Sequence, residues 1–179
     1  MDRSPAHVGL IPDGLRRWAR ANSASLADAY LRGSEKVTEI LLALQRNEVQ
    51  TASVYNLSRA NLARPDDQLE AVYAASIYFL TTLVPANFDA ATCSFRMHGD
   101  RDLLPAEFVA AAEALEATMT GPDFRINLLA AYDAEDELRS AYRRAQAQEC
   151  DINDAFEIGR VDMVIRTTAE PLLSGFLPY

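Results

Sequence analysis

The residues best suited to chemistry lie in one segment, HVGLIPDGLRRWAR, residues 7–20. An apolar strand, His7–Ile11, is predicted to end at a Pro-Asp-Gly turn that contains Asp13, and Arg16 and Arg17 open the helix that follows. An acid just beyond the carboxyl end of a buried strand lies where open α/β sheets bind ligands. A carboxylate there can bind Mg²⁺, which prefers oxygen ligands, and arginines there can hold phosphate. The segment predicts a site for Mg²⁺ and a phosphorylated ligand, with a solvated turn and an exposed basic helix as the alternative.

Composition bounds the class of protein. At 179 residues the chain is long enough for one domain with one sizeable core, and a net charge of -9 argues against nucleic-acid binding. Cys93 and Cys150 have no metal-ligand spacing, which favours reduced cysteines. No secretory signal precedes the first strand, and the longest apolar run, near residues 77–84, is too short to span a bilayer. We expect one cytoplasmic domain over residues 1–179, with no nucleic-acid partner and no stable membrane anchor.

Strands and helices alternate along the chain. Strands are predicted, from residue types suited to a pleated sheet and from turn signals, at residues 7–11, 51–58, 91–98, 124–132 and 163–167. Helices are predicted at residues 26–45, 65–83, 105–119 and 134–148, with a loop or frayed helix end at 20–26 and a short helix or turn at 151–158. In the fourth of these helices, Asp133 is the expected cap, and Leu138, Ala141 and Tyr142 are expected to face inward. The fold class is therefore α/β, with a mostly parallel central sheet flanked by helices.

The carboxyl ends of parallel strands meet at one edge of a sheet, so the topology gathers polar residues from distant parts of the chain. The residues expected at this edge are Asp13, Asn56–Ser58, His98–Asp100, Tyr132–Asp133 and Arg166–Thr168. Arg166 is a sharp candidate for a phosphate ligand because it ends a buried apolar run, where an unpaired charge is costly. The alternative is an ion pair with an acid such as Asp162 or Glu170. The two histidines, His7 and His98, have no partner at a recognisable spacing and are expected to be structural.

Three segments resemble the signature motifs of the cis-prenyltransferases, the undecaprenyl diphosphate synthase family. Residues 7–20 are similar to a strand that ends in Met-Asp-Gly-Asn, followed by Gly or Arg and then Arg-Trp-Ala. Residues 54–65, VYNLSRANLARP, are similar to Tyr-Ala-Phe-Ser-x-Glu-Asn-Trp-x-Arg-Pro, and residues 162–176, DMVIRTTAEPLLSGF, are similar to Asp-Leu-x-Ile-Arg-Thr-x-Gly-Glu-x-Arg-x-Ser-Asn-Phe. Their order and spacing agree with the family over nearly the whole chain, so the resemblance is specific for the fold and less so for the exact reaction.

The resemblance implies roles for the matching residues. In the family, the acid that matches Asp13 binds Mg²⁺ and assists the loss of diphosphate from an allylic substrate. Ser58 and Asn61 match polar residues associated with proton removal, with turn capping as the alternative. Arg166 and Ser174 match residues that hold the diphosphate of the second substrate.

Further residues are implied to contact substrate. They are Gly14, Leu15, Arg16, Arg17, Trp18, Tyr30, Asn56 and Arg64. For Arg16 the alternative is a solvated side chain, and for Arg64 it is a residue that fixes its own loop.

The chain departs from the family motifs at positions that bind substrate. Leu15 stands where the family has asparagine, Tyr30 where it has histidine, and Leu172 where it has the second arginine of the third motif. Asn56 replaces a small alanine beside the family's product tunnel. The lost arginine is expected to weaken the second diphosphate site, and the changes at Leu15 and Tyr30 alter the groups next to the first. The polar Asn56 in the tunnel leaves room only for a short product, so a regular long-chain synthase is not expected.

Lavandulyl and cyclolavandulyl diphosphate synthases are short relatives with a similarly modified first motif, and this chain resembles them most. We therefore expect a homodimeric, Mg²⁺-dependent prenyltransferase that joins two dimethylallyl diphosphates head to middle into a branched or cyclic C10 diphosphate. The alternatives are a regular short-chain synthase that uses isopentenyl diphosphate, a non-catalytic prenyltransferase subunit, and an enzyme that captures the allylic cation with water. The family continues beyond the position of Tyr179 with a glutamate ligand of Mg²⁺ and an Arg-x-Gly segment at the dimer interface, so this C-terminal segment is expected to be missing.

Overall fold

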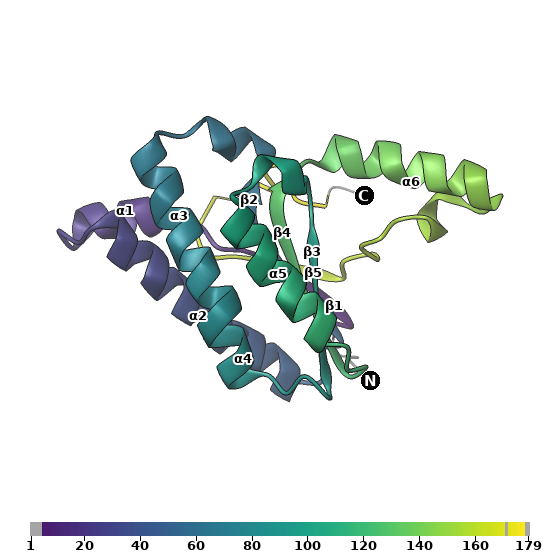
Figure 1. The fold of residues 1–179 in the computed structure, drawn as a ribbon, viewed down its shortest axis with the longest axis horizontal. Coiled ribbons are helices and arrows are strands. Elements are labelled where there is room, and N and C mark those ends of the chain that lie inside the picture. The colour runs from purple at the N-terminus through teal and green to yellow at the C-terminus, as the bar shows by residue number, and fades with distance from the viewer. Residues whose placement is uncertain (1–4, 171, 178–179) are drawn as a thin grey trace.

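A computed structural model describes residues 5–170 and 172–177, which form a parallel five-stranded sheet with the strand order β3-β4-β2-β1-β5 (Figure 1). The strands are β1 (His7–Ile11), β2 (Thr51–Ser58), β3 (Cys93–His98), β4 (Phe124–Tyr132) and β5 (Met163–Arg166). The predicted fold class is confirmed. In the register of β1 and β5, Ile11 lies opposite Arg166, so the residues that follow these two strands lie next to each other although they are far apart in sequence.

The helices connect the strands as expected, with one difference in length. They are α1 (Leu15–Ala21), α2 (Leu26–Arg46), α3 (Asp66–Tyr78), α4 (Val84–Asn87), α5 (Ala106–Thr118) and α6 (Ala134–Gln148). A π-helical turn, η2 (Phe79–Leu83), joins α3 to α4, so this helical stretch runs on to Asn87 rather than ending at residue 83. The single-turn 3-10 helices are η1 (Arg59–Ala63), η3 (Arg101–Leu103) and η4 (Ile152–Asp154).

The apolar run of residues 77–84, judged too short to span a bilayer, is part of a longer helical stretch, Asp66–Asn87. Its 22 residues and its hydropathy of 1.4 satisfy, by length and composition alone, the criteria for a helix that crosses a membrane. The same criteria are met by core helices, and α3 packs against α2 and α5. Val72, Phe79 and Leu80 of this stretch belong to the main core.

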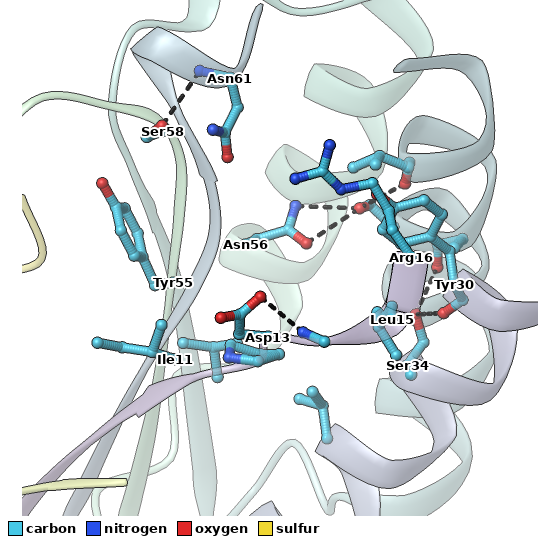
Figure 2. A pocket seen from close by; sticks show the side chains of 18 of the residues that line it. Ile11, Asp13, Leu15, Arg16, Tyr30, Ser34, Tyr55, Asn56, Ser58 and Asn61 are labelled. Carbon is cyan, nitrogen blue, oxygen red and sulfur yellow. Dashed lines mark hydrogen bonds between the residues drawn. The ribbon is translucent and has the colours of Figure 1, made fainter. Parts of the chain in front are cut away.

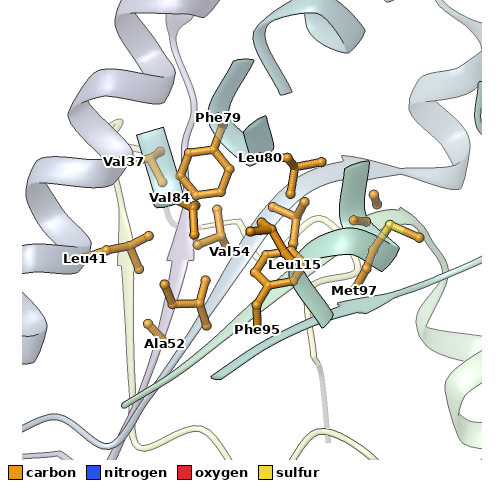
Figure 3. Close-up of a cluster of buried hydrophobic side chains, with 14 of the residues drawn as sticks. Val37, Leu41, Ala52, Val54, Phe79, Leu80, Val84, Phe95, Met97 and Leu115 are labelled. Carbon is orange, nitrogen blue, oxygen red and sulfur yellow. The ribbon is translucent and has the colours of Figure 1, made fainter. Parts of the chain in front are cut away.

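The main core lies between one face of the sheet and helices α2, α3 and α5, which cover that face in Figure 1. Figure 3 shows how Ala52 and Val54 of β2 face Leu41 of α2 and Phe79 of η2. Alternate residues along each strand contribute to this face, as the period of a pleated strand requires. Each fully buried large apolar side chain stabilises the fold by roughly 1.5–3 kcal/mol.

The opposite face carries a smaller core that fastens the C-terminal segment to the sheet. Phe176 is fully buried and packs with Ile11, Leu129 and Ile158. A Cβ atom on Gly9 would lie 2.4 Å from Cε1 of Phe176, so only glycine at this position of β1 lets the ring approach the sheet so closely. The buried ring therefore fixes the loop that carries Ser174.

The two histidines belong to one buried chain of hydrogen bonds that crosses the sheet. The Asn127 amide donates to Ser53 Oγ at 3.0 Å, and its oxygen lies 3.3 Å from His98 Nε2. Because Ser53 Oγ accepts from Asn127, its own hydrogen is free to donate to His7 Nε2, 2.8 Å away. His7 Nδ1 then donates to the Arg160 carbonyl at 3.1 Å. The geometry supports the expected structural role of both histidines.

The buried His7 predicts a pH dependence of stability. Burial lowers the pKa of His7, although the Arg160 carbonyl and the nearby Asp162 carboxylate oppose this. The unfolded chain therefore binds a proton below about pH 6.5 before the folded chain does. We expect the free energy of unfolding to fall as the pH drops from about 6.5 towards the lower pKa of folded His7, by at most about 1.4 kcal/mol per pH unit. Urea denaturation at pH 7.5 and 5.5 measures this, and the His7→Gln variant should show a smaller fall. An equal fall in both proteins would contradict the prediction.

Helix α6 corrects one detail of the sequence analysis. It extends away from the sheet (Figure 1), and the expectation that Leu138 and Tyr142 face inward is wrong, since they are 37% and 55% exposed. The buried face of α6 consists of the small residues Ala141 and Ala145. The pattern of large apolar residues therefore pointed to the wrong face. Asp133 does cap the helix, accepting from the backbone N–H groups of residues 135 and 136.

Candidate active site

A cavity of about 600 Å³ opens at the carboxyl edge of the sheet (Figure 2). Its walls come from the ends of β1 and β2, from α1, α2 and α3, and from the loop that follows β5. The structure brings almost all of the predicted site residues to this cavity: Asp13, Gly14, Leu15, Arg16, Arg17, Tyr30, Asn56, Ser58, Asn61, Arg64, Arg166 and Ser174.

Trp18 is the predicted site residue that does not line the cavity. Its ring lies 5.2 Å from the guanidinium carbon of Arg32, in a cation–π contact. Successive residues of an α-helix point about 100° apart, so α1 directs Arg16 and Arg17 towards the cavity and turns Trp18 away. The expected contact between Trp18 and substrate has no support in this arrangement.

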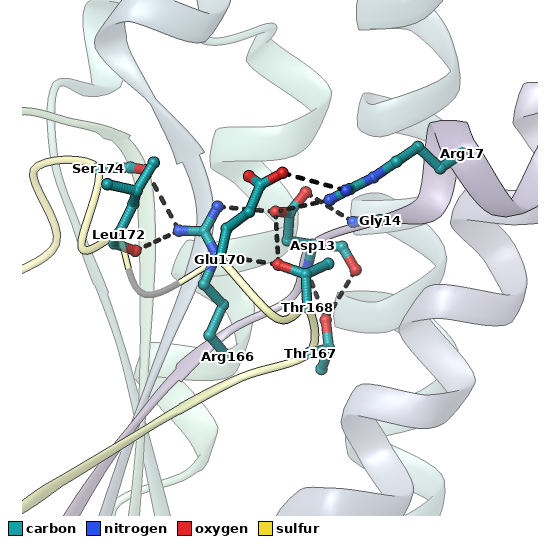
Figure 4. Close-up of polar contacts among 9 residues, drawn as sticks. All are labelled: Asp13, Gly14, Arg17, Arg166, Thr167, Thr168, Glu170, Leu172 and Ser174. Atoms are coloured by element: carbon teal, nitrogen blue, oxygen red, sulfur yellow. Dashed lines mark hydrogen bonds and ion pairs between the residues drawn. The ribbon is translucent and has the colours of Figure 1, made fainter.

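Asp13 lies at the mouth of the cavity and is held by donors from both ends of the chain (Figure 4). Its carboxylate accepts from the Gly14 N–H at 2.6 Å, Arg166 Nη2 at 2.7 Å, Thr168 Oγ1 at 3.0 Å and Arg17 Nη2 at 3.4 Å. Gly14 has a φ of 94°, a left-handed conformation that favours glycine. Burial would by itself raise the pKa of Asp13, but the hydrogen bonds from Arg166, Gly14 and Thr168 outweigh it and hold the pKa below its ordinary value. Asp13 is therefore ionised at neutral pH.

Arg166 connects Asp13 to the C-terminal loop. Besides the carboxylate of Asp13, its guanidinium donates to the Leu172 carbonyl and, at 3.2 Å, to Ser174 Oγ. The alternative of an ion pair with an acid does describe Arg166, but the acid is Asp13 and not the expected Asp162 or Glu170. Asp162 accepts from the backbone N–H groups of residues 6 and 7, and Glu170 pairs with Arg17. Arg166 and Ser174 thus face the cavity together, as the third motif predicted.

Arg64 is a half-buried cation in the cavity wall. Its Nη1 lies 3.5 Å from the Tyr30 hydroxyl, and among the described residues it forms no ion pair with an acid. Burial lowers the pKa of Arg64, yet an arginine stays charged at neutral pH. An anion in the cavity would supply a counter-charge to this guanidinium.

The inner part of the cavity has an apolar wall that also carries the hydroxyl of Ser34 and a polar contact between sheet and helix. Val37, Val54, Phe79 and Leu128 line it. Figure 2 shows the Asn56 amide of β2 directed at a hydroxyl group; this is Ser76 of α3, with Asn56 Nδ2 3.0 Å from Oγ and Oδ1 3.3 Å from it. The contact joins sheet and helix inside the cavity. Sequence reasoning singled out Asn56 but missed Ser76, because nothing in the sequence pairs the two positions.

Ser58 and Asn61 lie at the rim, and the capping alternative describes their contact. Ser58 Oγ accepts from the Asn61 N–H at 3.1 Å and caps η1. Both residues also line the cavity, so the capping role does not remove them from substrate. No histidine is among the described residues that line the cavity.

The donor set at the mouth fits a cation shared with substrate. Among the described residues, no group of three or more acids, histidines or cysteines is placed to hold a metal ion. Mg²⁺ needs no such cage, since one or two carboxylates with phosphate oxygens and water satisfy its octahedral shell. Asp13, ionised and 32% exposed beside arginines, would hold Mg²⁺ together with a diphosphate.

The cavity lies at the carboxyl edge of a parallel α/β sheet, with apolar residues in its wall and a carboxylate and arginines at its mouth, so it is suited to an apolar group that carries phosphate. Comparison with known proteins specifies the class as transferase, and the chain belongs to the undecaprenyl diphosphate synthase family of prenyltransferases, whose sequence model matches residues 11–179. The predicted family is confirmed.

The relatives include short-chain enzymes. Isoprenyl transferase 1 of Streptomyces avermitilis is 29% identical over 98% of this chain and 75% of its own length. The (2Z,6E)-farnesyl diphosphate synthase of Mycolicibacterium smegmatis is 32% identical over 97% of this chain and 73% of its own length. The crystal structure of lavandulyl diphosphate synthase from Lavandula x intermedia, in complex with dimethylallyl diphosphate, superposes with a TM-score of 0.85 at 21% identity, covering 96% of this chain and 81% of that one. This structural likeness supports the fold.

Proposed function

We propose that this prenyltransferase joins two dimethylallyl diphosphates head to middle and releases a branched or cyclic C10 diphosphate. The observation that carries the proposal is the cavity of about 600 Å³, whose apolar wall is interrupted by the contact between Asn56 and Ser76, with Asp13 and the arginines at its mouth. Such a cavity has room for a small apolar product and anchors for diphosphate. Departures from the family motifs at Leu15 and Leu172 also support a substrate pair other than that of the long-chain enzymes.

In the proposed reaction each site residue binds one substrate group or the metal ion. Arg17 and Arg64 hold the diphosphate of the allylic donor, Arg166 and Ser174 hold that of the acceptor, and Asp13 holds Mg²⁺. When bound, Mg²⁺ neutralises charge on the departing diphosphate. The bond between C1 of the donor and its diphosphate oxygen breaks, and the electron pair leaves with the diphosphate. The double bond of the acceptor attacks the allylic cation, and a proton is lost to the released diphosphate or near Ser58 and Asn61.

The proposal includes the state of the enzyme in the cell, which is a cytoplasmic, Mg²⁺-dependent homodimer without a nucleic-acid partner. This part rests on the resemblance to the family and on the acidic composition. Size-exclusion chromatography with light scattering measures the assembly.

A regular short-chain synthase is the second candidate. It is supported by the 32% identity to a (2Z,6E)-farnesyl diphosphate synthase, and it would add isopentenyl diphosphate to an allylic donor. A non-catalytic subunit is a third, supported by the polar groups that Leu15 and Leu172 replace.

Product analysis separates these candidates. The purified protein is incubated with Mg²⁺ and dimethylallyl diphosphate, with and without isopentenyl diphosphate, and the dephosphorylated products are identified by mass spectrometry. A branched or cyclic C10 product from dimethylallyl diphosphate alone supports the proposal. A linear product that requires isopentenyl diphosphate supports the regular synthase, and a free C5 alcohol indicates capture by water. No product under any condition supports the subunit.

The polar contact inside the cavity predicts product length. Removing both partners, in the Asn56→Ala/Ser76→Ala double variant, leaves no unsatisfied donor or acceptor there and enlarges the apolar space. For the second candidate, the regular synthase that adds isopentenyl diphosphate, we expect the double variant to form products at least one C5 unit longer than the wild type, as measured by mass spectrometry. The Thr81→Ala variant, at an exposed residue of the same helical stretch, is the control. Unchanged product length in the double variant would show that this contact does not limit the product.

A further inference from the structure

Two arginines at the cavity mouth are already paired with acids of the chain itself. Arg166 Nη2 lies 2.7 Å from Asp13 Oδ2, and Arg17 contacts Glu170 Oε1 at 3.2 Å and Asp13 Oδ2 at 3.4 Å (Figure 4). The two positive and two negative charges cancel. A guanidinium binds carboxylate and phosphate oxygens through the same edges, so these carboxylates occupy positions that a diphosphate would need.

The carboxylate of Asp13 is occupied in the same way. Its Oδ1 accepts from the Gly14 N–H, and its Oδ2 accepts from Arg166, Thr168 and Arg17. A metal ion binds through the lone pairs that these hydrogen bonds use. Oδ2 has no lone pair left, whereas Oδ1 keeps one beside the Gly14 N–H, so a cation that binds Asp13 through Oδ2 displaces arginine donors. A diphosphate at the arginines displaces carboxylate oxygens.

Arg64 provides the contrast within the same cavity. Its hydrogen-bond partner is the neutral Tyr30 hydroxyl, and no acid among the described residues forms an ion pair with it. Pairing with acids is therefore a feature of Arg17 and Arg166, and not of every arginine that lines the cavity.

We propose that the carboxylates of Asp13 and Glu170 occupy the phosphate positions on Arg166 and Arg17 until substrate arrives, so that cation binding and diphosphate binding reinforce each other. The inference rests on the proposed function, because it takes a diphosphate as the ligand of these arginines. A cation that takes Asp13 releases Arg166 and Arg17, and a diphosphate that takes the arginines releases Asp13. Such coupling is reciprocal and in proteins amounts to about 5- to 150-fold in affinity.

Glu170 acts in this scheme as a positioning residue. It lies on the loop that follows β5, and its side chain is 55% exposed, so its contact with Arg17 is weak and easily released. The pair of Asp13 with Arg166 is less exposed, with the arginine side chain at 14%, and carries the larger part of the coupling. Glu170 holds Arg17 over the mouth without touching the reacting atoms.

Calorimetric titration with inorganic pyrophosphate tests the inference without measuring turnover. Wild type and variants are titrated in the presence of EDTA and in the presence of Mg²⁺. The wild type is expected to bind pyrophosphate at least about fivefold more tightly with Mg²⁺. Glu170→Gln is expected to bind about two- to fivefold more tightly than the wild type in EDTA, because Arg17 is then free. Asp13→Asn is expected to bind more tightly than the wild type in EDTA and to gain nothing from Mg²⁺.

Two controls separate pairing from a general loss of negative charge. Glu135→Gln removes an exposed acid that pairs with Arg139 on α6 and should bind pyrophosphate as the wild type does. In the Arg17→Met background, Glu170→Gln should no longer tighten binding, since the interaction energy of a pair vanishes when its partner is absent.

The outcomes also separate this inference from the proposed function. Suppose that the wild type binds pyrophosphate with Mg²⁺ but neither Glu170→Gln nor Asp13→Asn binds more tightly in EDTA. The carboxylates then do not occupy the phosphate positions, and the inference is overturned while the diphosphate site stands. If the wild type binds no pyrophosphate in either condition, the diphosphate site is overturned, and with it both the proposed function and this inference.

Discussion

Replacing Asp13 with asparagine is expected to reduce prenyl transfer at least about 100-fold. The side chain keeps its size and its ability to accept the Gly14 N–H, but loses the charge that would hold Mg²⁺ at the departing diphosphate. The pKa of Asp13, held below its ordinary value by the bonds from Arg166, Gly14 and Thr168 despite burial, means that the wild type carries this charge throughout the neutral pH range. The effect should therefore appear in kcat with little dependence on pH between 6 and 8.

Steady-state kinetics with dimethylallyl diphosphate, analysed by product mass, measure the loss. The Glu39→Gln variant is the matched control, since Glu39 forms an exposed ion pair with Lys36 on α2. Circular dichroism verifies that the Asp13→Asn variant is folded. Activity within about threefold of the wild type would exclude Asp13 from the reaction, whatever the product proves to be.

Replacing Phe176 with alanine is expected to lower the free energy of unfolding by about 3–5 kcal/mol. The ring is fully buried between Gly9 of β1 and the small second core, so its removal leaves a cavity there. For a chain of this size the thermal midpoint should fall by roughly 6–20 °C. The loss would also free the loop that places Ser174 beside Arg166, where Ser174 has a φ of 54°, in the left-handed region that costs a non-glycine residue energy.

Thermal and urea denaturation measure the change in stability, and pyrophosphate titration measures the effect on the site. Leu173→Ala is the control in the same loop, because Leu173 is 46% exposed and its loss should change the stability by no more than about 0.5 kcal/mol. We expect Phe176→Ala to bind pyrophosphate more weakly even at temperatures where it remains folded. Unchanged stability in Phe176→Ala would mean that the second core does not hold the C-terminal segment.

Much of the fold was predictable from the sequence because its signals are local. The strands His7–Ile11, Thr51–Ser58 and Phe124–Tyr132 have the predicted bounds, since turn residues follow runs of sheet-forming side chains. The capping residue Asp133 was found from its type and place. The expectation that polar strand ends share one edge followed from parallel pairing alone, and it brought Asp13 and Arg166 to the same site.

Residue types and spacing within one element do not predict its contacts with other elements. Helix α6 shows this, because whether Leu138 and Tyr142 are buried depends on what packs against the helix and not on the spacing of its residues. The contact between Asn56 and Ser76 likewise depends on how α3 lies across β2. The sequence around Asn56 or Ser76 does not indicate which residue each of them contacts.

The sequence by itself determined the class of fold, the family and most of the polar residues at the mouth of the cavity. Only the tertiary structure decided how those residues pair: Arg166 with Asp13, 153 residues away, rather than with Asp162 or Glu170, which are near it in sequence, and Glu170 with Arg17. The physical reason is the strand order, in which β5 lies beside β1 and places the last motif of the chain against the first. A charged side chain pairs with the opposite charge nearest in space, and spatial neighbours across a parallel sheet are set by packing rather than by position along the chain.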